Sequence, residues 1–372
     1  MNGSMNTKPL RLEPKSMPRS APPAPVGCDD GHFGIKVCAG PDTFFTLPSR
    51  ATVGRQAASS INGGANTDLI YEIADGEYVT ITAGDSIGES ADTRNPDYPI
   101  SGTNRALVNH ALRKAGVRGD IFLVTGLPVN RFYVGGERND ELIEAKRQSL
   151  IRTVRSVSGD VLPNVTKHKV FSEAVASFFD ELINMDGSIN EEFKEISDSE
   201  PVAVVDVGGK TLDIATIKEG GGAIYPEFSG TSDSGALYVY DEINTFLRRE
   251  FQLSEDVPFG KLHTALTQGT YRLYSEKHDV RNAVSAMLDG FADRVGFDVS
   301  KLLGDASRLG RVLFVGGAAN LLSNRLDRVF PGIPLKAISV APASDDPRLN
   351  SAYANARGMY KAALVETLQS QR

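Results

Sequence analysis

The sequence lacks any apolar run long enough to cross a membrane. A helical span needs about 20 consecutive apolar residues, whereas the longest apolar stretches here, such as residues 201–207 and 312–315, have the length of strands. The N-terminus also lacks the apolar core segment of a secretory signal peptide. We therefore expect a cytoplasmic protein without direct membrane contact.

Cysteine and histidine are scarce. The spacing of the two cysteines, Cys28 and Cys38, fits neither a zinc knuckle nor a redox Cys-x-x-Cys pair, so we expect reduced thiols. The five histidines are scattered, without metal-ligand spacing. The formal net charge of −7 argues against a nucleic-acid-binding surface that covers the whole protein, although it is compatible with a local basic patch.

Length and composition are typical of a soluble globular protein with roughly two domains. The chain has 372 residues, of which 41% are hydrophobic and 23% are charged. Residues 1–26 mix prolines with lysines and arginines and contain few strongly hydrophobic side chains. We interpret them as a flexible, basic, proline-rich tail, which either contacts DNA or a partner or is simply solvated.

The rest of the chain is predicted to form two α/β domains, residues 27–200 and 201–372. Each domain opens with a strand–aspartate–glycine–strand hairpin, a weak internal duplication that indicates two similar domains facing each other. We expect a β-rich subdomain at about 43–100 and a helical subdomain at about 243–300. The pattern predicts strands at 121–125, 169–171, 202–207, 211–217 and 311–315, hairpins at 27–37 and 69–81, and helices at 104–115, 139–155, 173–183, 234–250 and 351–367.

The first hairpin carries a candidate phosphate-binding loop. It reads Asp29-Asp30-Gly31-His32-Phe33-Gly34-Ile35-Lys36. Glycines let the backbone bend sharply and bring its N–H groups close to an anion, and Lys36 is placed to offer a positive charge. Because aspartates repel phosphate directly, we expect Mg²⁺ between Asp29, Asp30 and the phosphates. Taken alone, the motif is also compatible with an ordinary hairpin.

The second hairpin repeats the same chemistry. It reads Asp206-Val207-Gly208-Gly209-Lys210-Thr211-Leu212-Asp213. A tight turn in which glycines only supply positive φ is the alternative, but Asp206 closes an otherwise apolar strand, where an unpaired charge is costly. A P-loop is excluded, because Val204 stands where that motif needs glycine and a strand follows Thr211 where it needs a helix.

A third glycine turn follows the strand at 311–315. Gly316 and Gly317 lead from this strand toward a helix, and small residues there permit a flat ligand to approach the backbone. A single Gly-Gly pair after a strand is weak evidence. Three such turns in this order indicate a nucleotide site built from both halves of the chain.

The order of these motifs resembles that of the actin, sugar-kinase and DnaK-type chaperone superfamily, over nearly all of residues 26–363. Within it, the chain resembles most the plasmid-segregation actins of the ParM/StbA family. Four features carry this resemblance: the doubled aspartate with Lys36, the segment Thr125-Gly126-Leu127-Pro128 followed by Tyr133, the segment Phe171-Ser172-Glu173-Ala174-Val175-Ala176, and the segment Asn355-Ala356-Arg357-Gly358-Met359-Tyr360.

The resemblance implies an actin-like (ribonuclease H-like) two-domain fold with a central nucleotide cleft. It assigns Mg²⁺ to Asp29, Asp30 and Asp206, and catalysis to Asp206 and to Glu173, which would orient or deprotonate the attacking water; a helix-dipole role is the alternative for Glu173. The remaining nucleotide contacts are assigned to Gly31, Lys36, Gly208, Gly209, Thr211, Gly235, Gly316 and Gly317. Phosphate contact by His32 and Lys210 stays open, as does ATP against GTP.

The function implied is that of an ATPase that polymerises head to tail. Hydrolysis would loosen the filament, and its growth would move plasmid DNA through a DNA-binding adaptor protein of a partition system. A non-polymerising, ATP-dependent small-molecule kinase is the alternative, although we find no sugar-kinase signature. A chaperone-like clamp ranks third, because such clamps carry a substrate-binding domain for which we find no room.

Overall fold

The computed structural model describes residues 21–56, 58–59, 65–82, 93, 95–341 and 344–371. Most of the expected tail, residues 1–20, lies outside the described residues. The first strand, β1 (Ala24–Asp30), begins three residues before the predicted start of the first domain, because residues 24–28 pair in parallel with β9. The first sheet strand therefore starts at Ala24 rather than at Gly27.

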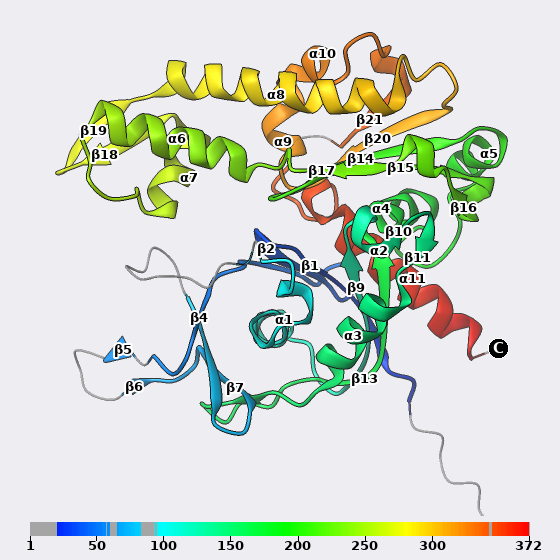
Figure 1. The fold of residues 1–372 in the computed structure, drawn as a ribbon. Coiled ribbons are helices and arrows are strands. Elements are labelled where there is room, and N and C mark those ends of the chain that lie inside the picture. The colour runs from blue at the N-terminus through cyan, green and yellow to red at the C-terminus, as the bar shows by residue number, and fades with distance from the viewer. Residues whose placement is uncertain are drawn as a thin grey trace, which may run out of the picture.

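Two lobes, each built on a mixed sheet, make up the molecule (Figure 1). The sheet of the lower lobe has the order β13-β9-β1-β2-β3, in which β9 pairs in parallel with both β1 and β13. The other strands pair antiparallel, and a tight hairpin joins β1 to β2. The strands not yet given are β2 (Gly34–Cys38), β3 (Phe44–Pro48), β9 (Asp120–Leu127) and β13 (Asn164–Ser172).

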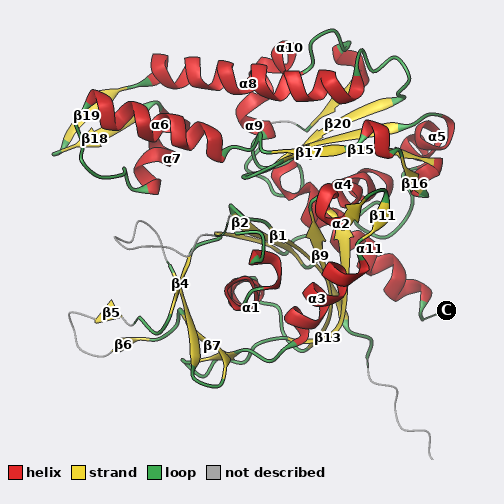
Figure 2. Cartoon of the chain, in the orientation of Figure 1, coloured by secondary structure: helices red, strands yellow, loops and turns green. Residues whose placement is uncertain are grey.

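Helices cover both faces of the lower sheet. Helix α1 (Gly102–Lys114) packs on the face that Val26 and Cys28 present. On the opposite face lie α4 (Glu173–Leu182) and α11 (Ala354–Gln369), which pack against each other and against β9 (Figure 2). Side chains at alternate positions of a strand point to opposite faces, so neighbouring residues of β1 enter different surroundings.

The C-terminal helix α11 corrects the predicted domain division. The sequence placed it in the second domain, but it packs against β1, β9 and α4 of the lower lobe. The close packing requires glycine at two positions, because any Cβ there would clash with a backbone. A Cβ on Gly358 would lie 1.7 Å from the carbonyl oxygen of Ala176, and a Cβ on Gly27 would lie 2.1 Å from the carbonyl oxygen of Ala356. These glycines let the backbones of α11, α4 and β1 approach each other.

The lower lobe also carries a small β-rich part. Its four-stranded sheet has the order β12-β7-β8-β4, and β5 pairs with β6 beside it. The predicted hairpin is present, with β7 and β8 starting and ending within one residue of the expected positions. The bounds are β4 (Ala51–Val53), β5 (Ala58–Ser59), β6 (Ala65–Asn66), β7 (Ile70–Ala74), β8 (Glu77–Ile81) and β12 (Arg155–Ser156).

The sheet of the upper lobe has the order β16-β15-β14-β20-β21, with β17 paired to β15. Every residue of β14 is buried, because α8 covers one face of the sheet and α4 the other. A strand covered on both faces reads as a continuous apolar run, as residues 202–205 do. The bounds are β14 (Val202–Val207), β15 (Leu212–Lys218), β16 (Ala223–Ile224), β17 (Gly230–Ser232), β20 (Arg311–Val315) and β21 (Ile338–Val340).

One end of the upper lobe is mainly helical, as the sequence predicted, but it carries a hairpin that the sequence analysis missed. Helix α6 (Leu237–Glu250), α7 (Phe259–Gln268) and α8 (Arg281–Leu303) pack together, and β18 (Thr270–Leu273) with β19 (Glu276–Asp279) forms the tip (Figure 2). At the other end lies α5 (Glu191–Ser199) (Figure 1). The short helices α9 (Ala319–Leu322) and α10 (Leu326–Val329) follow β20.

Two further predicted elements differ in extent. The helix expected at 139–155 is α3 (Asp140–Ile151), which ends where Arg152 adopts an extended backbone. It follows α2 (Val129–Phe132) and the short pair β10 (Tyr133–Val134) and β11 (Glu137–Arg138). The strand expected at 169–171 is the nine-residue β13. None of the helices in the described ranges has both the length and the apolar character needed to span a bilayer.

Candidate functional site

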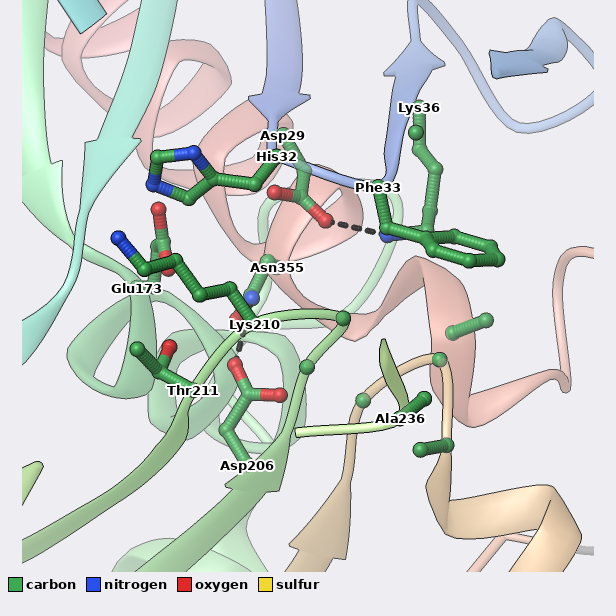
Figure 3. A pocket seen from close by; sticks show the side chains of 18 of the residues that line it. Asp29, His32, Phe33, Lys36, Glu173, Asp206, Lys210, Thr211, Ala236 and Asn355 are labelled. Carbon is green, nitrogen blue, oxygen red and sulfur yellow. Dashed lines mark hydrogen bonds and ion pairs between the residues drawn. The ribbon is translucent and has the colours of Figure 1, made fainter. Parts of the chain in front are cut away.

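A cavity of about 340 Å³ lies where the two hairpin loops face each other (Figure 3). Loop 1, residues 29–34, joins β1 to β2 in the lower lobe, and loop 2, residues 206–211, joins β14 to β15 in the upper lobe. Of the residues singled out from the sequence, the cavity is lined by Asp29, Gly31, Lys36, Glu173, Asp206, Gly208, Gly209, Thr211, Gly316 and Gly317. The structure thus brings together segments that are far apart in the chain.

Asp29 is the loop 1 carboxylate that faces the cavity. It accepts a hydrogen bond from Lys36 Nζ at 2.7 Å, and both side chains line the cavity. Burial alone would lower the pKa of Lys36, but the charge of Asp29 and its hydrogen bond raise that pKa above the ordinary value. Lys36 therefore stays protonated at the edge of the cavity, where its charge suits a phosphate.

Asp30 does not line the cavity, which corrects its predicted place beside the metal and nucleotide. It points to the α1 face of the sheet, where its carboxylate accepts hydrogen bonds from Lys146 Nζ at 2.8 Å and Asn104 Nδ2 at 2.9 Å. The Lys146 ammonium also donates to the carbonyl oxygen of Gly126. The reason is strand alternation: Asp30 shares its face with Val26 and Cys28, so it is buried in the interior of the lower lobe.

Asp206 is the upper-lobe carboxylate of the cavity. It is buried and accepts a hydrogen bond from Asn355 Nδ2 of α11 at 2.7 Å. Burial raises the pKa of Asp206 to about 7; the nearby Asp213 and Asp29 carboxylates add to the rise, whereas the Asn355 hydrogen bond and Lys36 oppose it. A buried carboxylate close to other acids is a site that a cation would stabilise.

Glu173 lies at the first position of α4 and completes the acidic group. Its pKa is raised well above the ordinary value, first by burial and then by Asp29, Asp213 and Asp206. The neighbouring strand approaches it closely, since a Cβ on Gly126 would lie 2.5 Å from Glu173 Cγ. The side chain is therefore held in the cavity by its surroundings (Figure 3).

The glycines of the site permit close approaches. A Cβ on Gly209 would lie 2.2 Å from Phe33 Cβ, so loop 2 can approach loop 1 this closely only when residue 209 is glycine. Gly316 has φ = +102°, and its Cβ would lie 2.3 Å from Asp206 Oδ1. Gly235 is not one of the residues that line the cavity; its Cβ would lie 2.3 Å from the Lys210 carbonyl carbon. Gly235 therefore packs closely against the backbone of loop 2, and its contact with the ribose and base stays a prediction.

Asp213 and Asn355 are site residues to which the sequence analysis gave no role. Asp213 accepts hydrogen bonds from Thr211 Oγ1 at 2.7 Å, Thr231 Oγ1 at 2.5 Å and the backbone N–H of Val129 at 2.9 Å. The last bond joins the upper lobe to the lower one. The sequence did contain a signal for Asp213. It stands on the same face of β15 as the apolar residues Ala215 and Ile217, which are buried, and a carboxylate on a buried face needs polar partners.

His32 and Lys210 both line the cavity. The His32 ring contacts the carbonyl oxygen of Thr93 through Nδ1, and Thr93 Oγ1 donates to the His32 carbonyl oxygen at 2.7 Å. Burial lowers the pKa of His32, so the ring is neutral at pH 7. Phosphate contact by either residue stays a prediction.

Aromatic side chains of the helical end line the same cavity. Tyr240 and His263 border it, and the Tyr240 hydroxyl lies 2.8 Å from His263 Nδ1. Phe33 of loop 1 packs against Tyr240 and Phe259 with ring centroids 5.5 and 5.4 Å apart. A cavity that combines ring surfaces, glycine loops, a lysine and carboxylates can hold a molecule with a flat ring and a metal-bound anion.

Two family models match consecutive parts of the chain. The model described as the N-terminal part of the plasmid segregation protein ParM matches residues 25–183. The model described as the C-terminal part of the MreB-like archaeal actin homologue matches residues 204–328. The boundary between them falls just before loop 2.

Whole-chain relatives agree with these matches. An archaeal actin homologue of Thermoplasma volcanium is 25% identical over 325 residues, covering 84% of this chain and 92% of that protein. A homologue of Thermoplasma acidophilum is 25% identical over 326 residues, with the same coverages.

Among solved structures, an archaeal actin homologue superimposes with a TM-score of 0.70 at 21% identity, covering 91% of this chain and 98% of that one. The homologue has also been solved in complex with ADP. A 15-stranded ParM filament from Clostridium botulinum gives a TM-score of 0.69 at 17% identity, with coverages of 91% and 98%. The chain thus has the two-domain actin-like fold, and it is similar to ParM in its N-terminal part and to archaeal actin homologues over most of its length.

Proposed function

We propose that this protein binds ATP with Mg²⁺ in the cavity between its lobes, hydrolyses it, and couples hydrolysis to head-to-tail assembly into a filament. The observation that carries the proposal is the convergence of Asp29 from one lobe and Asp206 from the other on a single cavity that also contains Glu173. The ADP complex of a similar archaeal actin homologue and the filament of a similar ParM support it.

The donor set of the cavity fits Mg²⁺. In the part of the chain that the structure describes, no three His, Cys, Asp or Glu side chains are grouped so as to hold a metal ion by themselves. Mg²⁺ usually keeps several waters and binds through one or two carboxylates and substrate phosphates. We propose that Asp29 and Asp206 supply these carboxylates, without Asp30, the third predicted metal ligand, which is buried against Lys146 and Asn104. Mg²⁺ would neutralise charge on the phosphates.

Glu173 is the proposed residue that orients the attacking water. Its carboxyl group lies in the cavity at the start of α4, and the ionised form accepts a hydrogen bond or a proton from water. Lys36 and the backbone N–H group of Gly209 would hold the phosphates, whereas the N–H group of Gly208 donates to the carbonyl oxygen of Thr211. Because the phosphates would touch both loops, their cleavage would weaken the link between the lobes and thereby the filament.

The cellular role belongs to the same proposal. A filament that lengthens with ATP can move DNA when a DNA-binding adaptor protein ties the two together. Plasmid segregation by this route is a prediction from the likeness to ParM. ATP is the proposed nucleotide, with GTP as the alternative.

The experiment measures light scattering and phosphate release after addition of ATP or GTP, with and without Mg²⁺. We expect scattering to rise with nucleotide and Mg²⁺, and phosphate release to follow. Asp206→Ala should lower hydrolysis by at least about a hundredfold, because the variant would lose a carboxylate that holds the proposed Mg²⁺ at the phosphates. Asp198→Ala, a change of an exposed aspartate on α5, is the control. Phosphate transfer that requires an added metabolite, without scattering, would instead identify a small-molecule kinase.

A further inference from the structure

The side chain of Asn355 joins the upper-lobe carboxylate of the cavity to a helix of the lower lobe. Its Nδ2 donates to Asp206 Oδ2 at 2.7 Å (Figure 3). Its Oδ1 accepts a hydrogen bond from Ser177 Oγ of α4 at 2.6 Å. All three residues are at most 7% exposed. The amide of Asn355 therefore forms a buried link between β14 and α4.

The partners of this amide fix its orientation. An ionised carboxylate only accepts hydrogen bonds, so the amide must present its NH₂ group to Asp206. The Ser177 hydroxyl donates to the carbonyl oxygen at the other side of the amide. If the amide rotated by 180°, its oxygen would face the Asp206 carboxylate and two acceptors would repel each other. Ser177 thus keeps the donor of Asn355 pointed at Asp206.

The other oxygen of Asp206 is confined by the third glycine turn, since a Cβ on Gly316 would lie 2.3 Å from Asp206 Oδ1. Ser351, four residues before Asn355, holds this turn. The Gly316 N–H donates to the Ser351 carbonyl oxygen at 3.3 Å, and Ser351 Oγ donates to the Gly316 carbonyl oxygen at 3.4 Å. Residues 351–355 therefore constrain both oxygens of the carboxylate.

Ion pairs lock α11 to α4 beside the amide. Asp180 of α4 accepts hydrogen bonds from Arg357 Nη2 and Lys361 Nζ of α11, each at 2.6 Å, and the three side chains are each 8% exposed. Glu173, the residue proposed to orient water, lies one helical turn before Ser177 on the same face of α4. The serine that holds the amide is thus itself held at a fixed distance from Glu173.

We propose that Asn355 is a positioning residue, which acts through Ser177 to hold the Asp206 carboxylate at a fixed place relative to Glu173. Asp206 and Glu173 belong to different lobes, so their spacing depends on a link between the lobes, and the amide supplies one. Hydrogen-bonded partners of metal-binding carboxylates commonly set metal affinity. This inference rests on the proposed function and adds a residue to its site.

Asn355→Ala removes the donor to Asp206 and leaves both carboxylates in place. We expect the affinity of the ADP-bound protein for Mn²⁺, used in place of Mg²⁺, to fall by about 10- to 100-fold, as for loss of a hydrogen-bonded partner of a metal ligand. Electron paramagnetic resonance of free Mn²⁺ measures this affinity without relying on hydrolysis. The affinity for ADP in EDTA should be unchanged.

Asn104→Ala is the matched control. Asn104 also donates to a buried aspartate, with its Nδ2 2.9 Å from an Asp30 carboxylate oxygen, but neither residue lines the cavity. This variant should lower the melting temperature and leave the Mn²⁺ affinity unchanged. An equal fall of Mn²⁺ affinity in both variants would overturn the inference, because it would show a general effect of lost stability.

Ser177→Ala tests whether the serine acts through the amide. By itself it should lower the Mn²⁺ affinity less than Asn355→Ala does, since the donor remains but is no longer held in one orientation. Added to Asn355→Ala, it should have no further effect, because the group through which it acts is gone. Additive losses in the double variant would overturn the proposed link.

Two further results would decide against the inference. Wild-type Mn²⁺ affinity in Asn355→Ala would reject it and leave the proposed function intact. A loss of ADP affinity in EDTA would also reject it, since the amide would then contact the nucleotide directly. A wild-type protein that hydrolyses neither ATP nor GTP would instead reject the proposed function, and this inference with it.

Discussion

The two hairpins that form the site have the same sequence pattern but opposite electrostatic states. In the lower lobe, Asp29 pairs with Lys36 and Asp30 pairs with Lys146, so each carboxylate of loop 1 has an ammonium partner. In the upper lobe, Asp206 receives a neutral amide hydrogen bond from Asn355, and its pKa rises to about 7. Loop 1 is thus electrically balanced within the fold, whereas the pKa of Asp206 indicates a position that favours an added cation.

The largest effect should come from the acidic group where the two loops meet. Glu173→Gln keeps the shape of the side chain but removes the proton acceptor, so we expect kcat to fall by about 10²- to 10⁴-fold. Nucleotide affinity should change little, since the proposed role of Glu173 is on the attacking water rather than on the bound phosphates. Phosphate release and binding of a fluorescent nucleotide measure the two quantities. Glu181→Gln, on the same helix, is the control; equal losses in both variants would contradict the assignment.

The balance of the lower lobe can be broken at Lys146. Lys146→Met leaves Asp30 buried without its ammonium partner, and removal of one member of a buried pair costs about 3–5 kcal/mol. Lys36→Met should cost clearly less, because Asp29 faces the cavity and can be reached by water or ions. Urea unfolding without nucleotide measures both. Equal losses of unfolding free energy would show that the two pairs are not as different as their positions indicate.

The state of Asp206 predicts a pH dependence of stability without nucleotide. The folded protein holds this proton up to about pH 7, whereas the unfolded chain releases it near the ordinary value of 3.8. Over that window the folded state binds more protons, so the free energy of unfolding falls as the pH rises, by on the order of 2–4 kcal/mol for this group.

Asp206→Asn should therefore reduce the fall in stability between about pH 4 and pH 7 and be more stable than wild type at pH 8, although it hydrolyses poorly. Glu173 also has a raised pKa, so part of the slope should persist. Thermal unfolding across the pH range measures this. A wild-type curve that rises over the window, or identical curves for both proteins, would contradict the prediction.

The smallest effect should come from the contact that joins the loops. Phe33 of loop 1 packs against the rings of Tyr240 and Phe259 in the upper lobe. The Arg50 guanidinium of the lower lobe lies 3.8 Å from the Phe259 ring centroid, so this contact between the lobes does not depend on Phe33 alone. Phe33→Ala should lower the free energy of unfolding by roughly 1–2 kcal/mol, less than the loss of a fully buried phenylalanine. It should also speed release of a fluorescent nucleotide. Phe171→Ala in the lower lobe, also partly buried, should lower stability without changing the release rate.

Much of the site could be predicted from the sequence, because local chemistry fixes it. Gly208, Gly209 and Gly316 stand where a backbone must approach another group closely, and a Cβ would clash. Lys36 and Asp206 could be identified from their loops alone. The sequence could also have shown that Asp29, not Asp30, faces the cavity. Side chains two residues apart on a strand point to the same face, so Asp30 lies on the buried face of β1 with Val26 and Cys28.

The rest depended on contacts between distant segments. Asn355 comes to Asp206 from 149 residues further along the chain, and Asp213 reaches the Val129 backbone across the lobes. The hairpin β18–β19 escaped prediction because its turn residues, Tyr274 and Ser275, carry no turn signal, and the strands are short.

By itself the sequence determined the alternation of strands and helices, the three glycine turns and the acidic, lysine-containing loops, because these follow from backbone geometry and local charge. Only the tertiary structure decided that α11 belongs with the lower lobe, that Asp29 rather than Asp30 faces the cavity, and that Asp206 lies beside Asn355. The physical reason is that these choices depend on which surfaces pack together, and packing joins residues whose separation along the chain carries no local signal.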